Sequence, residues 1–171
     1  MDGLLFDSER IVQRSWEIAG DELGIPHMGD VIYHTLGMNR AGRNEYFRKY
    51  IREGFPFEEF GKLTRDNFWK IVDKEGLPLK KGAKELLAYG KSQGYKMAVA
   101  TSSSREYAMG NLIRAGIDSY FDSVVCGDMV KKAKPDPEIY IYTMKKMGVK
   151  PKDCYVVEDS TFGLQAAESA G

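Results

Sequence analysis

Side chains able to bind and transfer a phosphate stand at the ends of apolar runs, or in the loops that follow them. They are Asp2, Thr101, Ser102, Ser103, Lys134, Glu158 and Asp159. In an open α/β sheet, ligands bind outside the carboxyl ends of the strands, so we expect these residues to meet at one edge. Hydroxyl and backbone N–H groups at a helix N-terminus donate to phosphate oxygens. A nearby lysine balances the charge of the transferring group, so the set suits a phosphate monoester.

The carboxylates add acid/base and metal chemistry to this set. Glu158 and Asp159 offer the oxygen ligands that Mg²⁺, a hard ion, prefers. Asp2 stands just before Gly3 and would follow a strand that precedes it. An aspartate two residues beyond a nucleophile can protonate a leaving oxygen and later activate water. Phosphoryl transfer is catalysed mostly by positioning and charge stabilisation, so these are the parts it requires.

Each of these residues also has a plainer explanation. Thr101 could cap the helix that follows it, and Lys134 could be a surface lysine. Glu158 and Asp159 could cap the next helix in the same way. Their coincidence at one edge of one predicted sheet favours the chemical interpretation.

Residues 80–171 alternate between strand and helix periodicity, which positions the polar groups. The apolar pattern predicts strands at 95–100, 123–126 and 154–157, with helices at 82–94, from 101–104 towards 116, and at 136–148. Glycines end the helices, and Asp136 with Pro137 begins the last of them. This alternation predicts an α/β fold with a doubly wound, Rossmann-like parallel sheet.

Residues 10–79 show helical stripes and no convincing strand. Val12, Trp16, Ala19 and Leu23 form one stripe, and further stripes follow around Tyr46 and Phe60. We therefore predict an all-helical cap domain at 10–79, inserted into a discontinuous core of 1–9 and 80–171.

The composition excludes several classes of function. The 171 residues carry 25 basic and 25 acidic side chains, a formal net charge of +0, so no nucleic-acid footprint is indicated. The chain has no apolar run of transmembrane length and no signal-peptide pattern, so we expect no membrane partner and a cytoplasmic location. Cys126 and Cys154 lie in apolar runs and are expected to be buried thiols.

Four segments, in the right order, resemble the haloacid dehalogenase superfamily of phosphotransferases, in its β-phosphoglucomutase-like subgroup with a helical cap. They are Met1–Glu9, Val99–Ser103, Lys134–Pro137 and Val156–Ser160. The resemblance implies that Asp2 is the general acid/base and a backbone ligand of Mg²⁺. It further implies that Thr101 holds the phosphate with Ser102 and Ser103, and that Lys134 balances charge. Glu158 and Asp159 would serve the metal site.

The predicted cap contributes one further candidate. In the segment 36–40, Leu-Gly-Met-Asn-Arg, the resemblance implies that Arg40 contacts a distal phosphate. A solvated arginine at a helix start is the alternative.

The first segment departs from the family pattern in one respect. The family motif reads Asp-x-Asp-Gly with the first aspartate as nucleophile, and Met1 falls on the x. We therefore expect the nucleophile and its strand to lie upstream. Relatives also continue past the last predicted helix, so we expect truncation at both ends and little activity in the 171-residue chain.

The leading prediction is a Mg²⁺-dependent phosphatase that acts through an aspartyl-phosphate intermediate. Its substrate would be a small phosphorylated metabolite, such as a sugar or nucleotide monophosphate. A β-phosphoglucomutase-like phosphomutase is the first alternative, because it needs the same core residues. A non-catalytic phosphoester-binding protein is the second, because the nucleophile is absent. The sequence leaves the metabolite and the oligomeric state open.

Overall fold

The computed structural model describes residues 1–35, 38 and 40–171, without the side chains of residues 40 and 41. It divides into two compact units, Met1–Asp7 with Leu77–Gly171 and Ser8–Gly76. The sequence-based boundaries lie after residues 9 and 79. None of the described helices is both long and apolar enough to cross a lipid bilayer.

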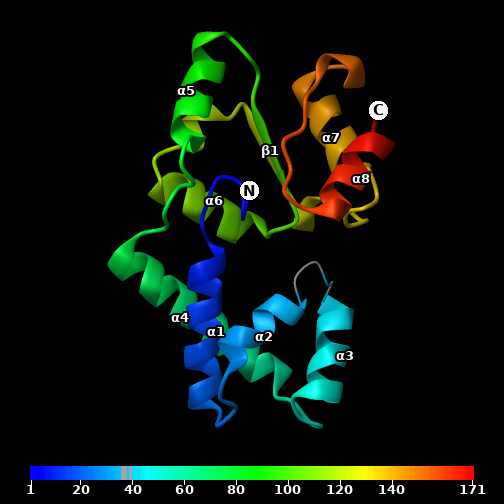
Figure 1. Ribbon diagram of the computed structural model, residues 1–171. Helices are drawn as coiled ribbons and strands as arrows, with labels where there is room; N and C mark the ends of the chain where they lie inside the picture. The colour runs from blue at the N-terminus through cyan, green and yellow to red at the C-terminus, as the bar shows by residue number, and fades with distance from the viewer. Residues whose placement is uncertain (36–37, 39) are drawn as a thin grey trace. The chain divides into compact units, whose positions relative to one another are not determined.

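The first unit is built around a parallel sheet. Strands β1 (Ala98–Thr101) and β2 (Ser123–Cys126) pair in register, with Val99 opposite Val124 and Ala100 opposite Val125. β2 has the bounds that the sequence predicts, whereas β1 is shorter than the predicted 95–100. Both strands run in the same direction between helices (Figure 1).

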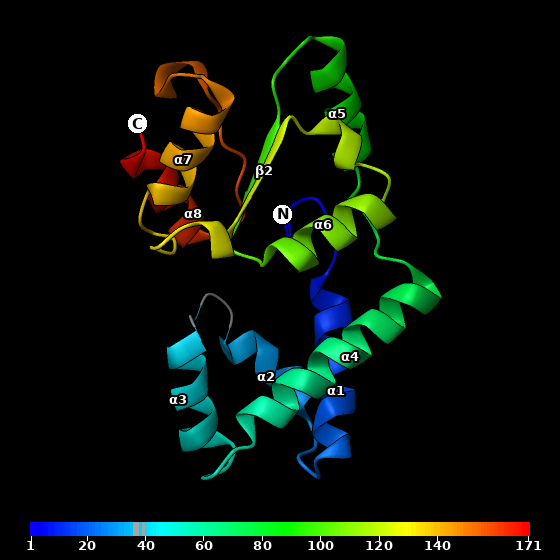
Figure 2. The same ribbon diagram turned by 180° about the vertical axis from the view of Figure 1, so that it is seen from behind.

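Helices cover both faces of this sheet. They are α5 (Ala83–Ser92), α6 (Arg105–Arg114), α7 (Glu138–Met147) and α8 (Thr161–Ser169), with 3₁₀ turns η1 (Asp118–Tyr120), η2 (Gly127–Met129) and η3 (Pro151–Asp153). Because side chains alternate along a strand, Val99 packs with residues of α5 and α6, while Val125 packs with residues of α7 and α8. Figures 1 and 2 show α5 and α6 on one side of the strands and α7 and α8 on the other. The predicted α/β fold with a parallel, doubly wound core is confirmed.

The N-terminal turn is anchored in this unit by its backbone and by Phe6. The Phe6 ring is fully buried in the cluster that contains Val99. The Asp7 N–H donates to the Pro78 carbonyl at 2.9 Å, and the Lys80 N–H donates to the Leu5 carbonyl at 2.8 Å. These contacts fix the segment that carries Asp2.

The predicted strand at 154–157 is not formed, which corrects the sequence-based expectation. The segment has the composition of a strand but lies outside the sheet. Among the described residues, β2 is the only partner of β1. Tyr155 is fully exposed, and Val156 and Val157 are 41% and 61% exposed. β-branched and aromatic residues favour a strand only where a neighbouring strand pairs with them. The segment 154–157 therefore has residues typical of a strand, but the strand pairing that its apolar pattern predicts is absent from the described part of the chain.

The second unit contains only helices among its described residues. They are α1 (Glu9–Glu22), α2 (Met28–Thr35), α3 (Arg40–Tyr50) and α4 (Phe57–Glu75). Its core is an aromatic cluster in which Trp16 meets Phe47 and Phe60 edge to face, with ring centroids 5.6 and 5.5 Å apart. Arg14 and Glu75 join α1 to α4 by two hydrogen bonds of 2.6 and 2.7 Å. The sequence-based expectation of a helical unit is confirmed here.

Close packing in this unit generates a paired stability prediction. Gly20 of α1 has no room for a methyl group, because a Cβ there would meet the Ile25 carbonyl and the Met28 side chain. Gly61 of α4 has open space, with Arg65 as its nearest neighbour at 3.7 Å. Gly20→Ala should destabilise the protein by about 1–3 kcal/mol through overpacking. Gly61→Ala should stabilise it by up to about 1 kcal/mol through helix propensity. Urea unfolding of both variants checks this, and destabilisation by both would contradict it.

Candidate active site

Lys134 is a buried cation at the end of β1. Its Nζ donates to the Glu158 Oε2 at 2.9 Å and to the Ala100 carbonyl at 3.2 Å. The Lys134 and Glu158 side chains are each only 9% exposed. The ammonium also lies 4.8 Å from the centroid of the Tyr140 ring. Lys134 is therefore not the solvated surface lysine of the plainer interpretation.

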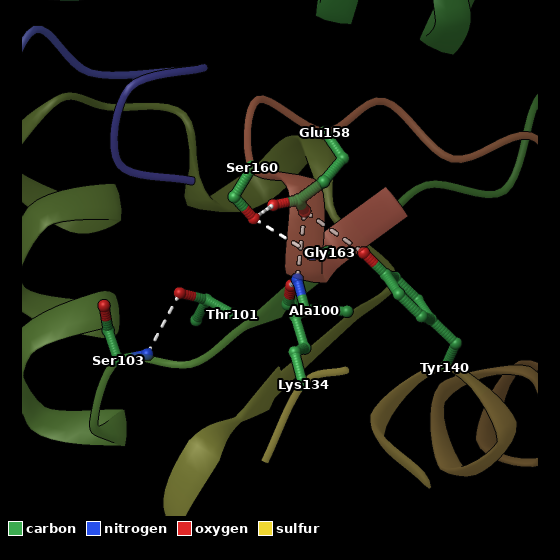
Figure 3. A network of polar contacts seen from close by, with 8 residues as sticks. All are labelled: Ala100, Thr101, Ser103, Lys134, Tyr140, Glu158, Ser160 and Gly163. Atoms are coloured by element: carbon green, nitrogen blue, oxygen red, sulfur yellow. Dashed lines mark hydrogen bonds and ion pairs between the residues drawn. The ribbon is translucent and has the colours of Figure 1, made fainter. Parts of the chain in front are cut away.

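The Glu158 carboxylate accepts the side-chain hydrogen bonds that make up this network (Figure 3). Its Oε2 also accepts a hydrogen bond from the Tyr140 hydroxyl at 3.1 Å, and its Oε1 accepts one from the Ser160 hydroxyl at 2.6 Å. Ser160 in turn accepts from the Gly163 N–H at 3.1 Å and so caps α8. The cap of α8 is Ser160, and neither Glu158 nor Asp159 takes that role.

The network shifts two titrations. Burial alone would raise the pKa of the Glu158 carboxyl, but its hydrogen bonds and the lysine charge outweigh burial, so the pKa lies below its usual range. Burial and the negative charge of Glu158 raise the pKa of Tyr140 well above its usual value. At neutral pH the pair is therefore a carboxylate and a neutral phenol.

Thr101 is the last residue of β1 and is 4% exposed. Its Oγ1 accepts a hydrogen bond from the Ser103 N–H at 3.2 Å (Figure 3). The cap of α6 is Ser104, whose hydroxyl accepts from the Tyr107 N–H at 3.4 Å. Thr101 is therefore not the helix cap. Ser102, between these residues, is exposed.

Asp2 lies in the N-terminal turn, and its carboxylate accepts hydrogen bonds from two hydroxyl groups. The Ser103 hydroxyl donates to its Oδ2 at 2.9 Å, and the Tyr107 hydroxyl donates to its Oδ1 at 2.9 Å. Asp2 and Ser103, both predicted site residues, are therefore brought together. The Tyr107 contact is one that sequence reasoning missed.

The prediction of a metal site at Asp2, Glu158 and Asp159 stays a prediction. No group of three or more His, Cys, Asp or Glu side chains able to hold a metal ion occurs in the described part of the chain. Glu158 is engaged by Lys134, Asp2 is engaged by Ser103 and Tyr107, and Asp159 is exposed. Glu158 and Asp159 have the oxygen chemistry that Mg²⁺ requires, and Asp2 is expected to bind the ion through its backbone, so the predicted set has only two side-chain ligands and stays a prediction.

Arg40 begins helix α3, and its side chain lies outside what the structure describes. The cysteines are both free, Cys126 buried in β2 and Cys154 half-buried outside the sheet. Tyr140 and Ser160 join the network although sequence reasoning gave them no part in the site. Tyr140 lies within the helix predicted at 136–148, but nothing in that prediction linked it to Glu158.

Comparisons with known proteins agree on one family. A family model described as haloacid dehalogenase-like hydrolase matches residues 1–171. The phosphorylated carbohydrates phosphatase of Thermotoga maritima is 33% identical over 171 residues, which cover 100% of this chain and 79% of that protein. The fructose-1-phosphate phosphatase YqaB of Escherichia coli is 45% identical over 75 residues, 44% of this chain and 40% of that protein.

Solved structures show the same similarity. The crystal structure of a Thermotoga maritima protein assigned as a beta-phosphoglucomutase superposes with a TM-score of 0.83 at 31% sequence identity. The match covers 99% of this chain and 78% of that one.

The tight fit of Glu158 against α8 generates the first prediction for the site. A Cβ on Gly163 would overlap the Glu158 carboxyl group. We expect Gly163→Ala to displace Glu158 from Lys134 and to destabilise the protein by about 1–3 kcal/mol, despite the better helix propensity of alanine. Gln165→Ala, at an exposed position of the same helix, is the control and should stay within about 0.5 kcal/mol of the wild type. Equal unfolding midpoints for both variants would show that the position of Glu158 does not depend on Gly163.

The lowered pKa of Glu158 generates a pH prediction. Because the folded-state pKa lies below the ordinary value of 4.5, the stability from this carboxylate is fully present above that value. It is lost as the pH falls through the folded-state pKa. Urea unfolding at about pH 6 and about pH 3 should show a smaller acid-induced loss in Glu158→Gln than in the wild type. The same loss in both proteins would mean that Glu158 does not carry the effect.

Proposed function

The chain belongs to the haloacid dehalogenase-like hydrolase family, and from that premise we propose that it is the core and cap of a phosphatase acting on a phosphorylated carbohydrate. The observation that carries the proposal is the buried Lys134, which bonds the carbonyl of Ala100, the residue before Thr101 at the end of β1. The relatives whose names state a phosphorylated carbohydrate or fructose 1-phosphate as substrate support the substrate class.

The groups at the end of β1 have complementary tasks in this proposal. The Thr101 hydroxyl and the backbone N–H groups that follow it donate to the phosphate oxygens. Lys134 has three N–H donors, of which Ala100 and Glu158 use two, so a third can reach the transferring group. Its charge offsets the negative charge that repels an attacking carboxylate.

Asp2 moves the proton in this scheme. Its carboxyl group protonates the oxygen of the departing sugar and afterwards takes a proton from the water that hydrolyses the aspartyl-phosphate intermediate. The attacking carboxylate belongs to the family motif two residues before Asp2, a place that precedes Met1. The exposed apolar residues 155–157 support a further strand in this region, because a parallel sheet normally buries such residues on both faces.

Magnesium belongs to the proposal as a family expectation. When bound, the ion would neutralise charge on the phosphoryl group. Glu158 and Asp159, with the backbone of Asp2, are the groups expected to hold the ion, and no step above is built on it. Phosphate release measured with Mg²⁺ and with EDTA tests the requirement.

The same assay of phosphate release distinguishes two alternative functions. A phosphomutase would return the phosphate to its substrate, and the similarity to a protein assigned as a beta-phosphoglucomutase favours this alternative. Isomerisation primed by a sugar bisphosphate, without release of inorganic phosphate, would establish it. Binding of phosphate esters without turnover would instead establish a non-catalytic protein.

The proposal predicts that catalysis requires residues upstream of Met1 and the hydroxyl group of Thr101. We expect an upstream-extended chain, screened with Mg²⁺ against phosphate monoesters, to release phosphate, and the 171-residue chain to be nearly inactive. Thr101→Val should lower kcat of the active chain by about 10²-fold, because it removes one donor to the phosphate. Thr143→Val is the matched control, since Thr143 is also buried and its hydroxyl donates to the Ile139 carbonyl within α7.

Each result has a clear reading. Equal activity of both chains would refute an upstream nucleophile, and equal loss in both threonine variants would refute a phosphate contact by Thr101. No release and no isomerisation by either chain would refute the catalytic proposal.

A further inference from the structure

We infer that Tyr107 is a positioning residue for Asp2, holding its carboxyl group in the orientation needed for proton transfer. The inference rests on the acid/base role proposed for Asp2 and adds a residue that no motif of the sequence indicates. Its basis is the hydrogen bond of 2.9 Å from the Tyr107 hydroxyl to the Asp2 Oδ1.

Two donors on the two oxygens fix the carboxyl group more tightly than one donor does. The Ser103 hydroxyl holds Oδ2 at 2.9 Å while Tyr107 holds Oδ1. The last torsion of an aspartate is broad and roughly two-fold, so a single hydrogen bond leaves the plane of the group free to rotate. The second bond removes that freedom. Hydrogen bonds to a carboxylate are also stronger than those between neutral groups.

Tyr107 is itself held firmly. It lies in the first turn of α6, where the Ser104 hydroxyl accepts from its N–H at 3.4 Å. The Asp128 Oδ2 accepts from the Arg105 N–H of the same turn at 2.9 Å. A capped helix start has little freedom to fray, so the phenol is presented from a fixed backbone.

The other side of the contact is equally anchored. Asp2 belongs to the turn in which the Leu5 N–H donates to the Met1 carbonyl at 2.8 Å, and the adjoining Phe6 is fully buried. The turn and α6 belong to the same compact unit. Figures 1 and 2 both show the N-terminus beside α6. The Tyr107 contact therefore joins two anchored segments and is not an encounter of loose side chains.

The arrangement gives Tyr107 a chemical task distinct from packing. A general acid speeds departure of a poor leaving group such as a sugar alkoxide, and contributes little when the leaving group is stable without a proton. Loss of the Tyr107 hydroxyl should therefore slow alkyl phosphates and leave aryl phosphates with acidic phenols nearly untouched. A packing defect would slow both classes alike.

The kinetic test uses Tyr107→Phe, which keeps the ring and removes the hydroxyl. In the chain that turns over, kcat/KM should fall about tenfold or more for a sugar phosphate, the equivalent of one hydrogen bond to a charged group. It should change less than about twofold for p-nitrophenyl phosphate. Tyr95→Phe, at a position 62% exposed, is the control and should change neither value. Equal losses on both substrates would overturn the positioning role.

A second measurement judges the contact without catalysis. Unfolding midpoints of Asp2→Ala, Tyr107→Phe and the double variant form a cycle in the 171-residue chain. If the double variant loses less stability than the sum of the two single losses, the contact is supported. If the two losses simply add, the contact is overturned. If no chain hydrolyses any monoester, the proposed function fails and the positioning role fails with it, while the cycle still decides whether Tyr107 holds Asp2.

Discussion

The ion pair between Lys134 and Glu158 is the interaction on which the end of the sheet depends. Removing two charges from water costs several kcal/mol per ion, and their attraction compensates only when other hydrogen bonds satisfy the remaining donors and acceptors. Here the Ala100 carbonyl, the Tyr140 hydroxyl and the Ser160 hydroxyl supply those bonds. The pair thus requires the end of β1, the helix α7 and the start of α8 to be in place together. In the proposed function, a charge held in this way is pre-organised for an anionic substrate and needs little rearrangement when one arrives.

Around this pair the polar groups separate into two sets. One set holds the cation and its partners, and the other holds Asp2 between Ser103 and Tyr107. The first suits charge stabilisation, and the second suits proton transfer. Thr101 lies between the two sets in the chain. The carbonyl of Ala100, just before it, accepts a hydrogen bond from Lys134, and the hydroxyl of Ser103, two residues after it, donates to Asp2. An open α/β sheet places such groups together outside the carboxyl ends of its strands, which is where the proposed function needs them.

The sequence predicted the elements whose evidence is local and failed where a distant partner decides. Helical spacing and terminal glycines located α5, α6 and α7 within a few residues, and the apolar run 123–126 predicted β2 with its bounds. The segment 154–157 has the composition of a strand, but no described part of the chain pairs with it, and composition alone cannot show that. Tyr107 and Asp2 are 105 residues apart in the chain, so no spacing pattern could join them. Glu158 was predicted as a metal ligand from its motif, while its partnership with Lys134 emerges only when the loop before α7 is in place.

The apolar segment after η3 has a consequence for the behaviour of the protein at high concentration. Tyr155, Val156 and Val157 offer exposed side chains and backbone groups outside the sheet. An unpaired extended segment of this kind is a template on which another extended chain can add. It carries no lysine or proline among these residues to oppose such pairing. The same residues that suit the interior of a sheet are therefore a place where another extended chain can pair, and a strand that paired with them would remove that tendency.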